Sequence, residues 1–241
     1  MVDRGHFATG VTQLGQIEPF AIRIDTVTTT TAPLLTLKTA RIAIALMVAM
    51  GLTACLPKTP SLPPGTLIEL TPVFTGKYSL TDANGTVRSP ADFTGKLSLI
   101  YFGFTSCPDV CPTALNVMVA GLNELADDTD QIQPLFITVD PEHDTQTVLH
   151  DYLSFDKRIL GLTGSVAAID QAKSAFKIYA ERQNLPDSAL GYTMDHSSLF
   201  YLVNRQGVPV YAIKDTITPQ QLAGFIPLLS QDVFLRGSPD S

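Results

Sequence analysis

The sequence predicts an α/β fold in which helices cover both faces of one mixed central sheet. Beyond residue 73, apolar strand-like runs alternate with helical patterns in the order β, α, β, α, α, β, β, α. This alternation favours neighbouring strands joined by helices that pack on the sheet. No internal repeat is visible, so a single domain spanning residues 73–235 is expected, which is long enough to bury a real core.

The first elements of this domain have clear local signals. An extra N-terminal hairpin is expected around the turn signal Asn84-Gly85, with short apolar-alternating segments on both sides. Residues 97–104 (LSLIYFGF) are almost continuously β-branched or aromatic, which is typical of a strand buried on both faces. Pro112 and Thr113 then open a helical pattern that runs to Leu125.

The remaining elements follow in the same way. We expect a buried strand at 134–139, a helix at 145–155 capped by Asp144, a helix at 165–179, strands at 198–203 and 208–212 around a turn, and a closing helix at 219–229 that starts with proline.

The segment before this domain has the layout of an export signal. Residues 38–55 contain two positive charges, an uncharged apolar stretch and small residues before Cys55, and this stretch is too short for a mature membrane anchor. The end resembles a bacterial lipobox, which implies lipidation of Cys55 and a protein anchored on the periplasmic or outer side of a bacterial membrane. The alternative is an ordinary buried helix that contains Cys55. The Pro-rich stretch 56–72 favours a tether, and residues 1–37 are expected to be an unstructured or non-native extension, with the true start near Leu37.

The charge of the chain limits its partners. Its net charge is −7, and from Cys55 onward it has 12 Lys and Arg against 20 Asp and Glu. An acidic surface without a basic cluster argues against nucleic acid as a partner. Nothing in the sequence indicates an oligomer, so a monomer is the simplest expectation.

Cys107 and Cys111 carry the main chemical signal. They lie between the strand 97–104 and the helix that follows it, in a Cys-x-x-x-Cys spacing that leaves room for an ion between two sulfurs. A helix N-terminus stabilises a thiolate, so a lowered pKa is expected for Cys111. Soft thiolates favour Cu(I), zinc or iron-sulfur clusters, but two sulfurs alone are an incomplete site for most of these. A structural disulfide is the alternative, although so short a loop gains little stability from one, about 2 kcal/mol or less.

A histidine could complete such a site. His150 is expected to face solvent on a helix, and His143 is expected to lie on the surface of a loop. His196 immediately precedes a predicted strand, and its neighbour Asp195 could orient its ring. Taken alone, His196 would more often be an ordinary loop or core residue than a ligand.

Four segments together resemble the SCO/SenC family of thioredoxin-like copper proteins. These are FGFTSCPDVCP at 102–112, VDPEHDT at 139–145, GLTG at 161–164 and DHSS at 195–198. The resemblance implies a thioredoxin-like fold and three copper ligands, Cys107, Cys111 and His196. One departure is His143, where the family more often has Arg, and an imidazole there could compete as a ligand.

The resemblance also implies a function. Copper, as Cu(I) or Cu(II), would be received and delivered to the dinuclear copper site of cytochrome c oxidase subunit II, and other periplasmic copper chaperones are possible partners. Such a metallochaperone is not an enzyme in the usual sense. The alternative is a thiol:disulfide oxidoreductase in which Cys107 and Cys111 are a redox-active pair that reduces that subunit or another exported target. A peroxidase is a weaker third reading, because a close Cys-x-x-x-Cys pair is not the usual peroxidase arrangement.

Overall fold

The computed structural model describes residues 62–125, 130–188 and 190–236, with side chains of the last helix described as far as Pro227. The chain divides into two units, residues 1–57 and 58–241, and everything described below belongs to the second. The predicted extension, the export signal and Cys55 lie outside the described residues. Within the ranges given above, no helix is long and apolar enough to cross a membrane.

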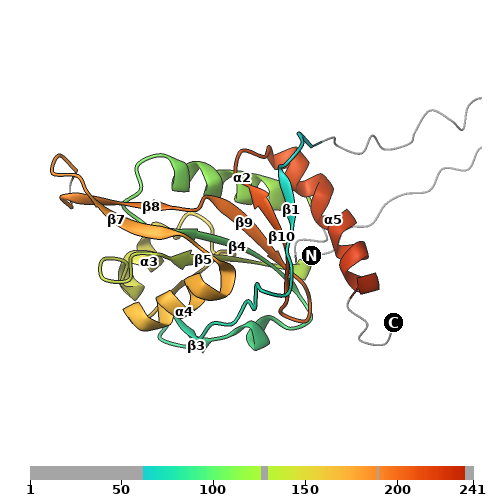
Figure 1. Ribbon diagram of the computed structural model, residues 1–241, viewed down its shortest axis with the longest axis horizontal. Coiled ribbons are helices and arrows are strands. Elements are labelled where there is room, and N and C mark those ends of the chain that lie inside the picture. The colour runs from blue at the N-terminus through green and yellow to red at the C-terminus, as the bar shows by residue number, and fades with distance from the viewer. Residues whose placement is uncertain (1–61, 126–129, 189, 237–241) are drawn as a thin grey trace, which may run out of the picture. The chain divides into compact units, whose positions relative to one another are not determined.

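A mixed sheet forms the centre of the described domain (Figure 1). Its strands lie side by side in the order β1 (Leu67–Glu69), β10 (Pro209–Lys214), β9 (Leu199–Val203), β4 (Leu97–Gly103), β5 (Ile132–Thr138), β6 (Leu160–Thr163), β2 (Leu80–Asp82) and β3 (Val87–Arg88). The β4–β5 and β5–β6 pairs are parallel, and the other neighbours are antiparallel. The predicted mixed α/β fold is thereby confirmed.

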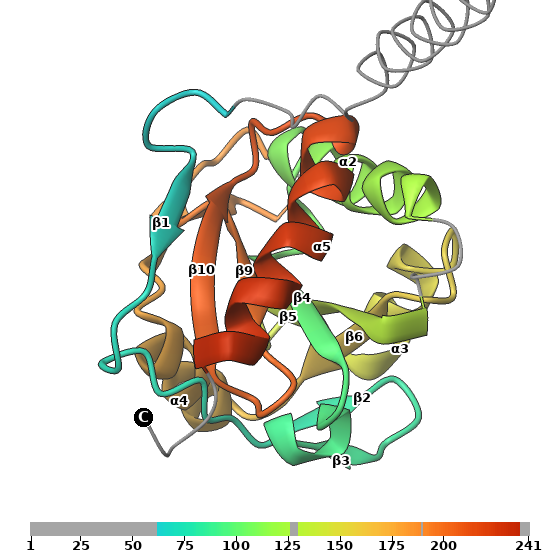
Figure 2. The same ribbon diagram turned by 90° about the vertical axis from the view of Figure 1, so that its right-hand side faces the viewer.

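Helices lie on both faces of this sheet (Figure 2). They are η1 (Pro90–Phe93), α2 (Val110–Glu124), α3 (Gln146–Tyr152), α4 (Val166–Phe176) and α5 (Pro219–Arg236). Helices α2 and α5 pack closely together, because Gly121 lets the Leu222 side chain approach the α2 backbone. Helix α4 covers the opposite face, where Phe176 packs on Phe102 and Tyr201.

Two neighbouring residues of β4 show how the core is divided. Tyr101 and Phe102 are completely buried, and successive side chains of a strand point to opposite faces. Phe102 belongs to the aromatic cluster under α4. Tyr101 packs on the other face against Phe136, Phe200 and the ring of His196. The second cluster therefore links the sheet to the region where the predicted site lies.

The observed elements differ from the predicted ones at several places. The hairpin around Asn84-Gly85 is present as β2 and β3. Strand β1 lies inside the predicted tether 56–72 and is an edge strand that pairs with β10, so the sheet begins before residue 73. Helix α3 is capped by the Thr145 hydroxyl rather than by Asp144, whose carboxylate is used elsewhere.

A separate two-stranded hairpin carries His196. Strands β7 (Ala180–Asn184) and β8 (Tyr192–His196) pair only with each other among the described strands, and Figure 1 shows them extending away from the main sheet. This hairpin was not predicted. It ends at His196, directly before β9, and so brings the imidazole back to the end of β4.

Candidate metal centre

The two cysteines lie in the loop and first helical turn that follow β4. We call residues 104–109, between β4 and α2, the cysteine loop. The Cys107 amide donates to the Phe104 carbonyl at 3.3 Å, which tightens this loop. Cys111 lies in the first turn of α2, and its backbone N–H donates to the Cys107 sulfur over 3.4 Å. This amide at the helix N-terminus, which has no partner within the helix, thus donates a hydrogen bond to the Cys107 sulfur.

Gly103 makes room for Cys111 at the end of β4. A Cβ atom at this position would lie 2.8 Å from the Phe136 ring and 3.0 Å from the Cys111 sulfur. Both distances are too short for a side chain in a packed interior. The absence of a side chain at Gly103 therefore lets the sulfur pack directly against the sheet.

His196 joins the cysteines from the other side. Its Nε2 lies 3.7 Å from the Cys111 sulfur. Its Nδ1 lies 3.0 Å from the Ser197 carbonyl, and because a carbonyl only accepts, Nδ1 carries a proton. Nε2 is then the nitrogen available to a metal. The carbonyl takes the orienting role that was expected of Asp195, which is exposed in β8.

The electrostatics of the two thiols reverse the prediction for Cys111. The pKa of Cys107 is lowered from 9.0 to about 4, chiefly because the Cys111 thiol donates a hydrogen bond to its sulfur, with the Cys111 amide adding to the effect. The pKa of Cys111 is raised, because that thiol gives its proton to the hydrogen bond and is completely buried. Cys107 is partly exposed. The thiolate is therefore Cys107, and the prediction of a lowered pKa for Cys111 is wrong.

Several polar groups around the sulfurs were missed by sequence reasoning. The Tyr101 hydroxyl lies 2.9 Å from the Ser198 hydroxyl, which donates to Asp215. Burial is the main cause that raises the pKa of Tyr101, and electrostatic interactions with Cys111 and Cys107 are further causes, so this hydroxyl lies near the pair. Within the described chain, the Tyr152 hydroxyl is the one buried side-chain polar atom without a hydrogen-bond partner. Burial, followed by electrostatic interactions with the two cysteines, raises the pKa of Tyr152 as well.

The other two histidines of the domain are not brought to the sulfurs by any contact. His150 is 67 % exposed on α3, as predicted. His143 is half-buried, and its Nδ1 lies 2.9 Å from the Asp144 carboxylate. Asp144 also binds Thr105 in the cysteine loop, and the Thr105 hydroxyl lies 3.4 Å from His143 Nδ1, so His143 lies beside the site.

The cysteines and His196 are close but are not a preformed cage. In the part of the chain that the structure describes, no three His, Cys, Asp or Glu side chains are arranged to hold a metal ion. The Cys111 thiol also keeps its proton, because its pKa is raised. Ion binding through both sulfurs therefore requires loss of the Cys111 proton.

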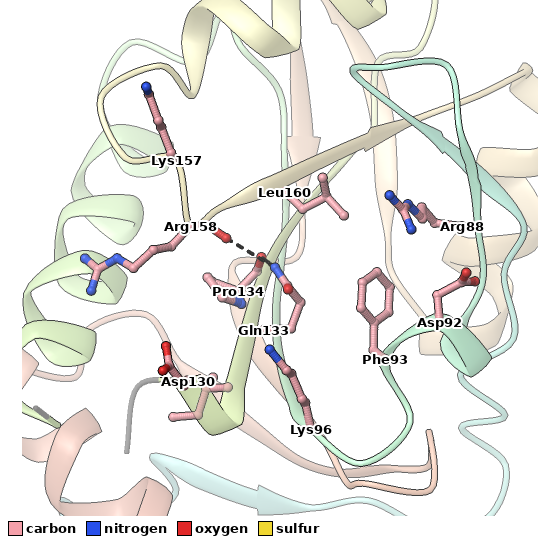
Figure 3. Close-up of a pocket in the computed structure, with 11 residues that line it drawn as sticks. Arg88, Asp92, Phe93, Lys96, Asp130, Gln133, Pro134, Lys157, Arg158 and Leu160 are labelled. Atoms are coloured by element: carbon pink, nitrogen blue, oxygen red, sulfur yellow. Dashed lines mark hydrogen bonds between the residues drawn. The ribbon is translucent and has the colours of Figure 1, made fainter. Parts of the chain in front are cut away.

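A separate pocket of about 470 Å³ lies at the other end of the parallel strands (Figure 3). Phe93, Pro134 and Leu160 form its apolar part, and Lys96 and Lys157 are among the basic residues at its rim. It contains neither sulfur nor imidazole. The cysteines follow the carboxyl end of β4, which is the usual edge for functional groups in an open α/β sheet.

Fold and site together define a thioredoxin-like protein with a Cys-x-x-x-Cys pair and a histidine at the end of its sheet. The chain belongs to the SCO1/SenC family, which it matches over residues 69–227. The resemblance noted from the four sequence segments is thereby confirmed.

Individual relatives agree with this assignment. The chain is 40 % identical over 152 residues to a SCO2-like protein of Rickettsia felis, which covers 63 % of this chain and 74 % of the relative. It is 37 % identical, with a TM-score of 0.58, to ScoI of Bradyrhizobium japonicum, which was solved with copper bound; this match covers 63 % of our chain and 96 % of ScoI.

A more distant structure shares the fold. BsSco is 22 % identical with a TM-score of 0.50, and the match covers 66 % of this chain and 93 % of BsSco. It is described as a member of the Sco family of cytochrome c oxidase assembly proteins, with a disulfide switch. At this identity the likeness to BsSco shows the fold alone.

Proposed function

We propose that this protein is a metallochaperone that binds one copper ion through Cys107, Cys111 and His196 and delivers it to the dinuclear copper site of cytochrome c oxidase subunit II. The observation that carries the proposal is the 3.7 Å approach of His196 Nε2 to the Cys111 sulfur, beside the thiolate of Cys107. Two thiolates suit Cu(I), and an added imidazole suits Cu(II). Copper is the cargo of this site.

The residues of the chain have distinct tasks in this proposal. Cys107 is ionised and partly exposed, so it meets the incoming ion first. Cys111 then loses its proton and closes on the ion from the buried side. His196 supplies Nε2, with its ring oriented by the Ser197 carbonyl. Its edge-on contact with Phe104 also fixes the plane of the ring.

Export and a lipid anchor at Cys55 complete the proposal. The copper site of the oxidase subunit is served from outside the cytoplasm, and the signal-like residues 38–55 would place the domain there. Other periplasmic copper chaperones would supply the ion. The acidic charge of the chain agrees with cationic cargo and argues against nucleic acid as a partner.

Copper stoichiometry on the reduced domain tests the metal assignment. The wild-type protein should bind one copper per chain, whereas Cys107→Ser and Cys111→Ser should abolish tight binding. His150→Ala, which changes an exposed histidine, is the matched control. Stoichiometric binding retained in either serine variant contradicts the assignment of the ligands.

Thiol:disulfide oxidoreduction is the second candidate function, and one observation favours it. The pair consists of a partly exposed thiolate and a buried thiol with a raised pKa. The Cys107 thiolate could attack a target disulfide and form a mixed disulfide. Cys111 would then lose its proton and attack Cys107, so that the target dithiol is released while the pair is oxidised by two electrons. A protein that reduces a disulfide target but binds no copper would belong to this class.

A further inference from the structure

The segment 140–144 between β5 and α3 contacts both parts of the candidate site. Its two aspartates are almost completely buried, Asp144 at 0 % and Asp140 at 4 % exposed. Buried carboxylates are costly unless they are well hydrogen-bonded, so their partners show what they hold. Asp144 binds the cysteine loop, and Asp140 binds the β7–β8 hairpin, here called the histidine hairpin.

Asp144 is bound to the cysteine loop through Thr105. Its Oδ1 accepts from the Thr105 hydroxyl at 2.6 Å and from His143 Nδ1 at 2.9 Å. Its Oδ2 accepts from the Thr138 hydroxyl at 2.6 Å and from the Thr105 amide at 3.0 Å. Four donors fill the accepting capacity of one carboxylate. Since Thr105 precedes Cys107 by two residues, this network fixes the backbone that enters the cysteine loop.

Asp140 is bound to the histidine hairpin through Tyr192. The Tyr192 hydroxyl donates to Asp140 Oδ2 at 2.7 Å, and Tyr192 opens the strand that ends at His196. Arg182 lies 3.5 Å above the Tyr192 ring and donates to Glu142 at 3.2 Å. That ion pair is exposed and contributes little. The Tyr192–Asp140 bond is therefore the main polar contact of the hairpin with this segment.

The segment itself is tied down at both ends. The Asp140 carbonyl accepts from the amides of His143 and Asp144, and the Asp140 amide donates to the Thr138 hydroxyl. The Thr163 hydroxyl of β6 donates to the Asp144 carbonyl. The two carboxylates are thus fixed relative to each other and to the sheet.

We propose that Asp144 and Asp140 are positioning residues, which set the cysteines and the histidine relative to one another through two separable contacts. Neither carboxylate is assigned to bind the ion. The copper-binding measurements that test this inference rest on the proposed function. The measurements of Cys107 alkylation and of amide exchange in β8 need no copper.

The test uses variants that each delete one hydroxyl group. Thr105→Val removes the hydroxyl contact to Asp144 but keeps the amide contact, and Thr105→Ser should restore the lost bond. Tyr192→Phe removes the contact to Asp140 while it keeps the ring under Arg182. Tyr179→Phe is the matched control, because its hydroxyl binds only Glu181 on the exposed surface.

The first measurements are made on the reduced, metal-free protein. Thr105→Val should accelerate alkylation of Cys107 by about threefold to tenfold, the effect of one lost hydrogen bond, and leave amide exchange in β8 unchanged. Tyr192→Phe should accelerate exchange of the β8 amides by a similar factor and leave Cys107 alkylation unchanged. Equal effects of both variants on both readouts, or no effect of either, would overturn the inference.

Copper binding provides the second measurement. Tyr192→Phe should weaken Cu(II) binding by about tenfold, as outer partners of metal ligands do, with little change for Cu(I). Thr105→Val should weaken both. If the wild-type protein bound no copper, the proposed function would fail, while the alkylation and exchange results would still decide whether the two aspartates position the site.

Discussion

The Nε2 atom of His196 lies 3.7 Å from the sulfur of Cys111, although 85 positions separate the two residues in the chain. The contact depends on the histidine hairpin, which returns the chain to the carboxyl end of β4. Because the Ser197 carbonyl holds Nδ1, the nitrogen that faces the sulfur is the one able to ligate a metal.

This relationship predicts an unequal effect of His196→Ala on the two oxidation states of copper. Cu(II) binding should weaken by about a hundredfold or more, because the variant loses its only nitrogen ligand among the three proposed ones. Cu(I) should be nearly unaffected, since two thiolates can hold it in near-linear geometry. Competition titrations with a chelator for each oxidation state measure both affinities. Equal weakening would show that the imidazole binds both states alike.

The lowered pKa of Cys107 predicts an unusual pH profile of its reactivity. With a pKa of about 4 in the folded protein, Cys107 stays ionised from pH 8 down to pH 5, so its rate of alkylation by iodoacetamide should hardly change over this range. The rate should fall only as the pH approaches 4. In Cys111→Ala the main hydrogen-bond donor is lost, and the fall should move to higher pH. A wild-type rate that rises tenfold per pH unit between 5 and 8 would exclude the thiolate.

Gly103→Ala should disturb the site through packing. The new methyl group would lie 2.8 Å from the Phe136 ring and 3.0 Å from the Cys111 sulfur, and such overpacking costs about 1–3 kcal/mol. Urea unfolding measures this cost, and the same variant should bind copper more weakly. Gly95→Ala meets no neighbouring atom, although its positive φ strains alanine, so it serves as the control for backbone effects.

Phe176→Ala tests the core on the opposite face of the sheet. Phe176 is completely buried against Phe102, Tyr201 and Tyr78, so its truncation should destabilise the fold by about 3–5 kcal/mol. Val166→Ala on the same helix removes an exposed side chain and should change stability by less than about 0.5 kcal/mol. Similar midpoints for the two variants in urea would contradict the packing described for α4.

Cys55→Ser tests the lipid anchor. If the protein is anchored only through lipid on Cys55, the variant should appear in the soluble fraction after cell lysis, whereas the wild-type protein stays with the membranes. Fractionation with an antibody against the domain measures this. Continued membrane association of the variant would indicate an uncleaved apolar anchor instead.

The parts of the fold that the sequence predicts well are those with strong local patterns. The run 97–104 is apolar throughout because β4 is buried on both faces, and the helices α2 and α4 repeat apolar residues at helical spacing. The histidine hairpin escaped prediction because β7 reads AERQN, which is polar and largely exposed and has no alternation. Strand β6 was not predicted either, because it is only four residues long.

The structure brings together the three residues that the sequence singles out, Cys107, Cys111 and His196, but the electrostatics of the two thiols were not predicted. The expectation for Cys111 considered only its place at the start of α2. The hydrogen bond that the Cys111 thiol donates to Cys107, together with the complete burial of Cys111, outweighs the effect of the helix N-terminus on its pKa, and the amide that would stabilise a thiolate points at Cys107. The roles of Asp140 and Asp144 depend on partners far away in the chain, Tyr192 and Thr105, which no local pattern reveals.

The complete burial of Cys111 beside a partly exposed Cys107 sets an order of events for any exchange at this pair. A donor and an acceptor both have to approach the same sulfur, so they cannot be engaged at once. If the protein transfers copper or electrons as proposed, the transfer should follow ping-pong kinetics, in which one partner leaves before the next arrives. The turnover of the protein would accordingly be set by how quickly each partner vacates a single docking position.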